Sequence, residues 1–169
     1  KMIFLAAKPN KAHLKLAEME QAGKLSAIVT QNIDGLHQAA GSKNVFELHG
    51  SVHRNYCQKC GKFFDVNYVV NAKGVPYCDE CGGIIKPDVV LYEEGLDSQT
   101  INGAVRAISK ADMLIIGGTS LVVYPAAGMI DYFKGKYLAV LNRDATSRDK
   151  QADLCITDPI GEVLGRIRV

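Results

Sequence analysis

The sequence predicts an α/β protein in which a small cysteine-rich module is inserted into a parallel, doubly wound sheet. Short apolar runs alternate with segments of helical spacing, and residues 54–86 interrupt this rhythm with a stretch rich in Cys, Gly, Lys and Asp. Strands that alternate with helices favour a parallel sheet, because each crossover helix covers one of its faces. At 169 residues, 47% of them hydrophobic, the chain is long enough for one core and a small insertion.

The first part of the α/β pattern is a helix followed by two short strands. Asn10 is a suitable N-cap and Gly23 a suitable C-terminal stop, so the apolar spacing between them predicts a helix over residues 11–22. Residues 25–30 (LSAIVT) form an apolar run without alternation, which is typical of a strand buried on both faces of a parallel sheet. Residues 45–48 (VFEL) predict a second strand.

The same pattern resumes after the cysteine-rich segment. The predicted helices cover residues 98–110, 124–133 and 159–167, and the predicted strands cover residues 112–116, 137–141 and 154–156. Cys155 lies alone in the last apolar run, and we expect it to be a small buried hydrophobe. The sequence therefore predicts a sheet domain made of residues 1–53 and 87–169, with residues 54–86 as an inserted module.

Charge and hydropathy exclude several classes of partner. Lys and Arg number 20 and Asp and Glu 18, so the net charge of +2 provides no basic field for nucleic acid or anionic lipid. No apolar run approaches the roughly 20 residues of a membrane-spanning helix. The opening KMIFLAAKPNKAH lacks the apolar core of a secretory signal. We therefore expect a cytoplasmic protein with no nucleic-acid partner and no membrane partner.

Four of the five cysteines have the spacing of a metal site. Cys57-x2-Cys60 and Cys78-x2-Cys81 are separated by 17 residues, and each pair is followed by glycine. Two such pairs bring four thiolates to one Zn²⁺ with a closed shell, which makes the metal structural. Two disulfides are an alternative that a chain without a secretory signal disfavours, and a redox-active pair would not need a second matching pair. A nucleic-acid-binding ribbon is a further alternative, but the mixed charge of residues 54–86 argues against it.

Polar residues gather where the predicted strands end, which is the edge at which doubly wound sheets bind ligands. In chain order they are Gln31, Asn32 and Asp34, then His49, then Gly118, Thr119 and Ser120, then Asn142. The glycine turn before Thr119 allows backbone amides to approach a phosphate, and Asn142 is suited to a nucleotide ribose. Asn32 and Asp34 also have a structural interpretation, because both residue types are good helix caps. His49 competes with His13, His37 and His53 for a functional role.

Taken in order, the segments TQNIDGLHQAAG, ELHGS, the two CxxC pairs, GGTSLVVYPAA and LNRD resemble the sirtuin family, in a bacterial-type form. The resemblance covers nearly the whole chain. Sirtuins are NAD-dependent protein lysine deacylases with a Rossmann-like domain and a small zinc-ribbon domain around a cleft. The resemblance therefore implies a Rossmann-like NAD-binding domain with an inserted zinc ribbon, NAD as co-substrate, one structural Zn²⁺, and an acylated-lysine protein or peptide as partner.

The resemblance also implies a role for each strand-end group. His49, Asn32 and Asp34 would be catalytic, with His49 as the base and Asp34 recognising the nicotinamide carboxamide. The implied NAD contacts are Gln31, Asn32, Ile33, Asp34, His49, Gly118, Thr119, Ser120, Asn142 and Ile160. The peptide would pair as a strand with residues 88–92, whose implied substrate contacts are Val89, Val90, Leu91 and Tyr92. The implied reaction moves the acyl group to ADP-ribose as nicotinamide leaves.

The chain departs from the family pattern at two places. The family's glycine-rich GAGxS motif and the arginine-bearing loop after it are absent, so we expect an N-terminally truncated fragment without the first strand, which alone binds NAD poorly and turns over little. At Tyr92-Glu93-Glu94 many relatives carry Phe-Gly-Glu, so Glu93 adds bulk and charge near the substrate groove. The alternatives are ADP-ribosyl transfer from the same pocket, or a non-catalytic zinc-ribbon interaction module for which His49 is dispensable.

Overall fold

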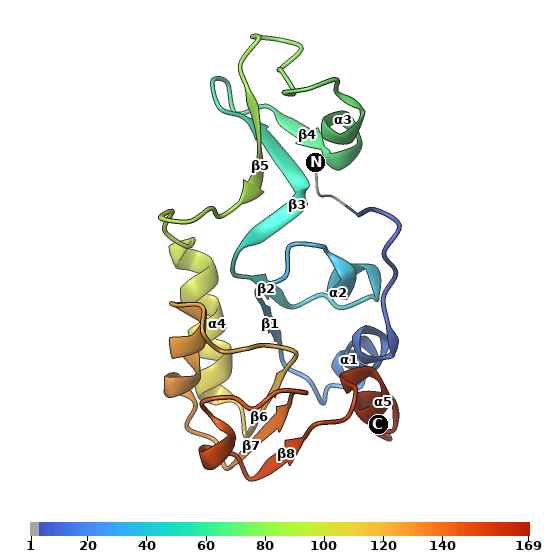
Figure 1. Ribbon diagram of the computed structural model, residues 1–169, viewed down its shortest axis with the longest axis vertical. Coiled ribbons are helices and arrows are strands. Elements are labelled where there is room, and N and C mark those ends of the chain that lie inside the picture. Colours follow the sequence, from blue (N-terminus) through green and yellow to red (C-terminus); the bar gives the residue numbers. More distant parts are fainter. Residues whose placement is uncertain (1–3) are drawn as a thin grey trace.

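The structure is a computed structural model, and it describes residues 4–169. The molecule is elongated, with a broad part of parallel strands and helices and a narrow part of antiparallel strands at the other end (Figure 1). The C-terminus lies in the broad part (Figure 1).

The broad part contains two parallel sheets. One pairs β1 (Ile28–Thr30) with β2 (Val45–Glu47), and the other has the order β6-β7-β8, made of β6 (Met113–Gly117), β7 (Tyr137–Leu141) and β8 (Leu154–Ile156). The central strand β7 is buried at all positions after the first, as its apolar run YLAVL predicts. The predicted α/β class and the parallel pairing are therefore confirmed.

Helices cover both faces of the β6-β7-β8 sheet. On one face α1 (Lys11–Gln21) and α5 (Ile160–Gly165) pack against Ala139 and Leu141 of β7. On the other face the 3₁₀ helix η1 (Ala126–Tyr132) packs against Leu138 and Val140, and α4 (Ser98–Lys110) packs against η1. Successive residues of a strand point to opposite faces, so β7 supports both layers. Figure 1 shows α4 on one side of this sheet and α1 with α5 on the other.

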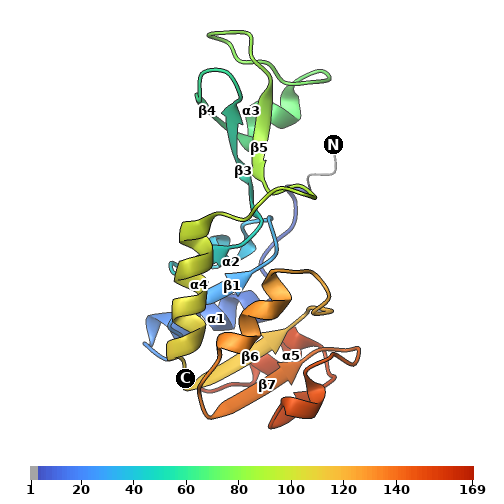
Figure 2. The same ribbon diagram turned by 90° about the vertical axis from the view of Figure 1, so that its left-hand side faces the viewer.

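The narrow part is an antiparallel sheet with the order β4-β3-β5 and one short helix. Its elements are β3 (Gly50–Cys57), β4 (Phe63–Asp65), α3 (Val66–Asn71) and β5 (Ile85–Val89). Its core consists of Cys57, Phe64, Val69, Cys78 and Ile85. Strand β3 runs from the broad part into the narrow part, so it joins the two (Figure 2).

Several elements differ from the sequence prediction. The helix expected over residues 124–133 is the 3₁₀ helix η1, and the sequence pattern did not predict α2 (Leu36–Ala39) or the 3₁₀ helix η2 (Asp149–Gln151). The closing helix ends at Gly165, before the expected limit of residue 167. The expectation that Cys155 is buried is wrong: its side chain is exposed, because β8 is an edge strand of its sheet among the described residues.

Candidate active site and metal centre

The four cysteines of the two CxxC pairs meet at the far end of the narrow part. Their sulfur atoms lie within 4.8 Å of one another, with Cys57 Sγ 3.4 Å from Cys81 Sγ and Cys60 Sγ 3.7 Å from Cys78 Sγ. A tetrahedral Zn²⁺ with Zn–S bonds of about 2.3 Å requires sulfur–sulfur edges of about 3.8 Å. The backbone amide of Cys60 lowers the pKa of the Cys57 thiol to about 6, which favours the thiolate form that binds metal. The four residues are therefore positioned to bind one Zn²⁺.

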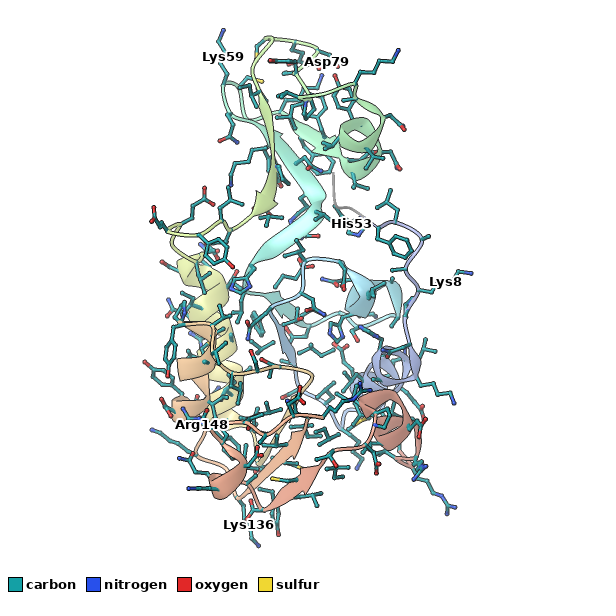
Figure 3. All side chains as sticks on the ribbon, in the orientation of Figure 1. Lys8, His53, Lys59, Asp79, Lys136 and Arg148 are labelled. Carbon is teal, nitrogen blue, oxygen red and sulfur yellow. The ribbon has the colours of Figure 1, made fainter. Side chains whose placement is uncertain are left out.

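A lysine joins the two cysteine pairs independently of any metal. Lys62 Nζ lies 2.8 Å from Asp79 Oδ1 and 2.9 Å from Glu80 Oε1, and both carboxylates raise the pKa of Lys62. Figure 3 shows Lys59 and Asp79, one from each pair's turn, at the same end of the molecule. The two turns are thus held together by charge as well as by sulfur.

The loop of residues 31–35 follows β1 and is shaped by its own side chains. Thr30 Oγ1 accepts a hydrogen bond of 3.1 Å from the Asn32 amide, and Asp34 Oδ1 accepts one of 3.0 Å from the Leu36 amide. Asp34 therefore forms an Asx turn just before the short helix α2, whose N-cap is Gly35. The side chain of Asn32 is exposed, and those of Gln31 and Ile33 are half-buried.

His49 follows β2 and lies against this loop. Its Nδ1 is 3.2 Å from the backbone oxygen of Gln31. A carbonyl oxygen only accepts, so Nδ1 carries the proton and the neutral ring keeps its lone pair at Nε2. The side chain is half-buried, and its backbone oxygen accepts a hydrogen bond of 3.1 Å from the Val90 amide. His49 thus stands between the residue 31–35 loop and residues 88–92.

The other three histidines support the structure around the loop. The rings of His13 and His37 lie 4.7 Å apart, and burial lowers the pKa of both. His13 also completes the cap of α1 together with Asn10. His53 Nε2 donates to the backbone oxygen of Asp34 at 2.9 Å. The sequence offered His53 only as a competing candidate, because nothing near it in the chain indicates this distant contact.

Residues 88–92 continue from the end of β5 beside His49. Val89 and Val90 are half-buried, whereas Leu91 and Tyr92 are exposed. The Leu91 amide donates to Glu94 Oε2 at 2.9 Å, and Lys86 Nζ lies 3.1 Å from the same oxygen. Glu93 has a φ of 72°, the left-handed conformation that glycine adopts without strain.

The remaining candidate residues lie at the carboxyl ends of β6, β7 and β8. The Gly118 amide donates to Leu141 O at 3.2 Å, next to Asn142, and a Cβ placed on Gly117 would lie 2.4 Å from Ile160 Cδ1. Asn142 Nδ2 donates to the backbone oxygen of Asp144 at 2.8 Å. Thr119 Oγ1 accepts from the Leu121 amide at 3.2 Å, and Ser120 is exposed. Gly118, Asn142 and Ile160, far apart in the sequence, therefore gather at one end of this sheet.

Comparison with known proteins identifies the class to which this fold and site belong. The sequence model of the Sir2 family matches residues 1–125. The NAD-dependent protein deacetylase of Clostridium acetobutylicum is 67% identical over 165 residues, which are 97% of this chain and 67% of that protein. The NAD-dependent protein deacetylase of Clostridium perfringens is 64% identical over 168 residues, 99% of this chain and 69% of that protein. The chain belongs to the Sir2 family, the sirtuins.

Solved structures agree with this assignment. A structure described as "Sir2-p53 peptide-NAD+" has a TM-score of 0.89 at 41% identity and covers 96% of this chain and 70% of that one. "Structure of Sir2Tm bound to a propionylated peptide" has a TM-score of 0.90 at 41% identity, covering 96% and 70%. In the described part of this chain, none of the helices has the length and apolar character needed to span a membrane.

Proposed function

We propose that this chain is part of an NAD-dependent protein lysine deacylase, with His49 as the general base. The observation that supports this most strongly is the setting of His49, which is fixed through Nδ1 to the Gln31 carbonyl while its backbone pairs with Val90. That arrangement directs the unprotonated Nε2 away from the loop contact. The names of the relatives, NAD-dependent protein deacetylases, support the same activity.

NAD is the proposed co-substrate, bound by the strand-end residues. The proposed contacts are Gln31, Asn32, Ile33, Asp34 and His49 from one sheet, and Gly118, Thr119, Ser120, Asn142 and Ile160 from the other. Asp34 Oδ1 accepts from the Leu36 amide, and a carboxylate can also accept the N–H donors of a carboxamide ligand. Solved Sir2 structures described as containing NAD support this part of the proposal.

The proposed partner is an acylated-lysine protein or peptide that adds a strand beside Val89, Val90, Leu91 and Tyr92. Pairing through the backbone accepts many sequences, because the hydrogen bonds do not depend on side chains. Relatives of known structure are described as bound to acetylated and propionylated peptides.

Proton transfer by His49 is the step that this chain's own residues define. NAD supplies the ribose carbon that the acyl oxygen attacks as nicotinamide departs. His49 Nε2 would take the proton of a ribose hydroxyl, so that this oxygen could accept the acyl group. One water is consumed as the lysine amine leaves. The products are nicotinamide, the free lysine and O-acyl-ADP-ribose.

The zinc ribbon of this proposal is residues 54–86, inserted in a sheet domain of residues 1–53 and 87–169. Cys57, Cys60, Cys78 and Cys81 would bind one Zn²⁺ with no position left for water, so the metal stabilises the ribbon. We also place the protein in the cytoplasm, because thiolates of this kind persist in a reducing compartment.

Nicotinamide release tests the proposal in the full-length natural protein. Release that requires an acetyl-lysine peptide, and that falls at least 100-fold in His49→Ala, supports deacylation with a general base. Release with the unmodified peptide as well would favour ADP-ribosyl transfer. Unaffected release in His49→Ala would refute His49 as the base, and no release from the wild type with any acylated peptide would favour the non-catalytic module. That residues 1–169 alone bind NAD poorly stays a prediction, tested by titrating them with NAD.

A further inference from the structure

A break in the pairing of β3 with β5 lies at the junction between the broad and narrow parts. Ser51 pairs with Asp88 and Asn55 with Pro87, so three residues of β3 lie between two consecutive residues of β5. This is a β-bulge, a feature that redirects side chains. Asn55 is fully buried, and its Nδ2 donates to Val52 O at 3.1 Å, which fixes the shape of the bulge.

The first two bulge residues hold the loop of residues 31–35. The Val52 amide donates to Ile33 O at 3.0 Å, and His53 Nε2 donates to Asp34 O at 2.9 Å. A Cβ on Gly35 would lie 2.8 Å from His53 Cδ2, so the imidazole packs directly on the Gly35 backbone. Figure 3 shows His53 on β3, facing the loop that precedes α2. His53 thus fixes the peptide group that follows the Asp34 side chain.

The third bulge residue holds the segment on the other side of β3. Arg54 Nε lies 2.7 Å from Asp88 Oδ2, and Arg54 Nη1 lies 2.7 Å from Glu47 Oε2. The Glu47 side chain is only 9% exposed, so Arg54 is the ion-pair partner of a nearly buried carboxylate. Glu47 lies two residues before His49, and Asp88 directly precedes Val89. Arg54 therefore connects the strand that leads to His49 with the strand that leads to residues 89–92.

We propose that His53 and Arg54 are positioning residues with separate roles, His53 for the loop that binds NAD and Arg54 for the strand that binds the peptide. The proposal rests on the proposed function for the identity of the two ligands. Neither side chain needs to touch a ligand: His53 holds the backbone of the loop at Asp34, and Arg54 holds the side chains of Glu47 and Asp88, which precede His49 and Val89.

A double comparison of variants in the full-length natural protein tests this separation. His53→Phe removes the donor, and we expect the KM for NAD to rise about fivefold to tenfold, the effect of one lost hydrogen bond, with the peptide KM within twofold. His53→Gln, which retains an N–H donor, should recover most of the loss. Arg54→Met should do the opposite: it should raise the KM for the peptide and leave the KM for NAD within twofold. Arg106→Met, which removes an exposed arginine of α4, is the control and should change neither.

Amide hydrogen exchange gives a readout that needs no activity. His53→Phe should speed exchange at the Leu36 amide and leave the Val90 amide unchanged, and Arg54→Met should do the reverse. Equal changes at both amides, or equal changes in both KM values, would overturn the proposal, because a general loss of stability affects both segments. A wild-type protein that binds neither NAD nor acetyl-lysine peptide in calorimetry would refute the proposed function, and the exchange pattern would still decide the positioning roles.

Discussion

Directly after His49, the backbone of Gly50 lies very close to the backbone of Asp88 in β5. Gly50 has a φ of 75°, and a Cβ placed on it would lie 1.9 Å from the backbone oxygen of Asp88. The next closest atoms, Asp88 C at 2.9 Å and Val89 Cα at 3.4 Å, also belong to the backbone of β5. No side-chain rotation relieves this overlap, so in Gly50→Ala the two strands must separate.

Two costs add in Gly50→Ala. A left-handed conformation costs a non-glycine residue about 1–2 kcal/mol. Forcing an extra carbon into a closely packed position costs about 1–3 kcal/mol more. We therefore expect the free energy of unfolding to fall by about 2–5 kcal/mol.

Gly23→Ala is the matched control, because Gly23 has a φ of 69° but no atom within 4 Å of its Cβ position. It should lose only the conformational cost, about 1–2 kcal/mol. Urea unfolding of both variants measures the difference, and amide exchange at Val90, which donates to His49 O, reports whether the strands have separated. Equal losses in the two variants would refute the argument that backbone contact, and not φ alone, requires glycine at position 50.

Three other changes test individual contacts. Glu93→Gly relieves a φ of 72° and should raise the free energy of unfolding in urea by about 0.5–1 kcal/mol; a loss would show that the Glu93 side chain stabilises the loop. Chelation should release one Zn²⁺ per chain and remove amide protection in β3 and β4 while β7 stays protected; an unchanged β3 would contradict a structural metal. Hydrogen bonds from the Leu91 amide, and next from Lys86, lower the pKa of Glu94, so this contact is complete above the usual value of 4.5 and is lost as pH falls through the lowered pKa. The Leu91 amide NMR resonance should therefore titrate below pH 4.5 in the wild type and not in Glu94→Gln; the same titration in both would exclude Glu94 as the cause.

Local sequence signals predicted the parts of the molecule that depend on neighbours in the chain. The spacing of the two CxxC pairs predicted that four sulfur atoms would meet, since each pair forms one turn. The rule that ligand-binding residues follow parallel strands predicted that His49 and the loop after β1 would adjoin, and the bond between His49 and Gln31 O joins them.

Features that depend on strand order and register were not accessible to the sequence. Cys155 has an apolar neighbourhood in the chain, but its exposure follows from β8 lying at the edge of its sheet. The β3 bulge arises because Ser51 and Asn55 pair with Asp88 and Pro87, residues far along the chain. The contacts of His53 and Arg54 follow from that register, so no local pattern indicated them.

Analysis of the reaction products by mass spectrometry tests the central claim most directly. The full-length natural protein is incubated with NAD and an acetyl-lysine peptide, with His49→Ala in parallel. The account predicts equal amounts of deacetylated peptide, nicotinamide and O-acetyl-ADP-ribose in the wild type, and loss of O-acetyl-ADP-ribose in the variant, because His49 is the proposed base for the ribose hydroxyl proton. Free acetate without acetylated ADP-ribose, or full product formation by His49→Ala, would contradict it.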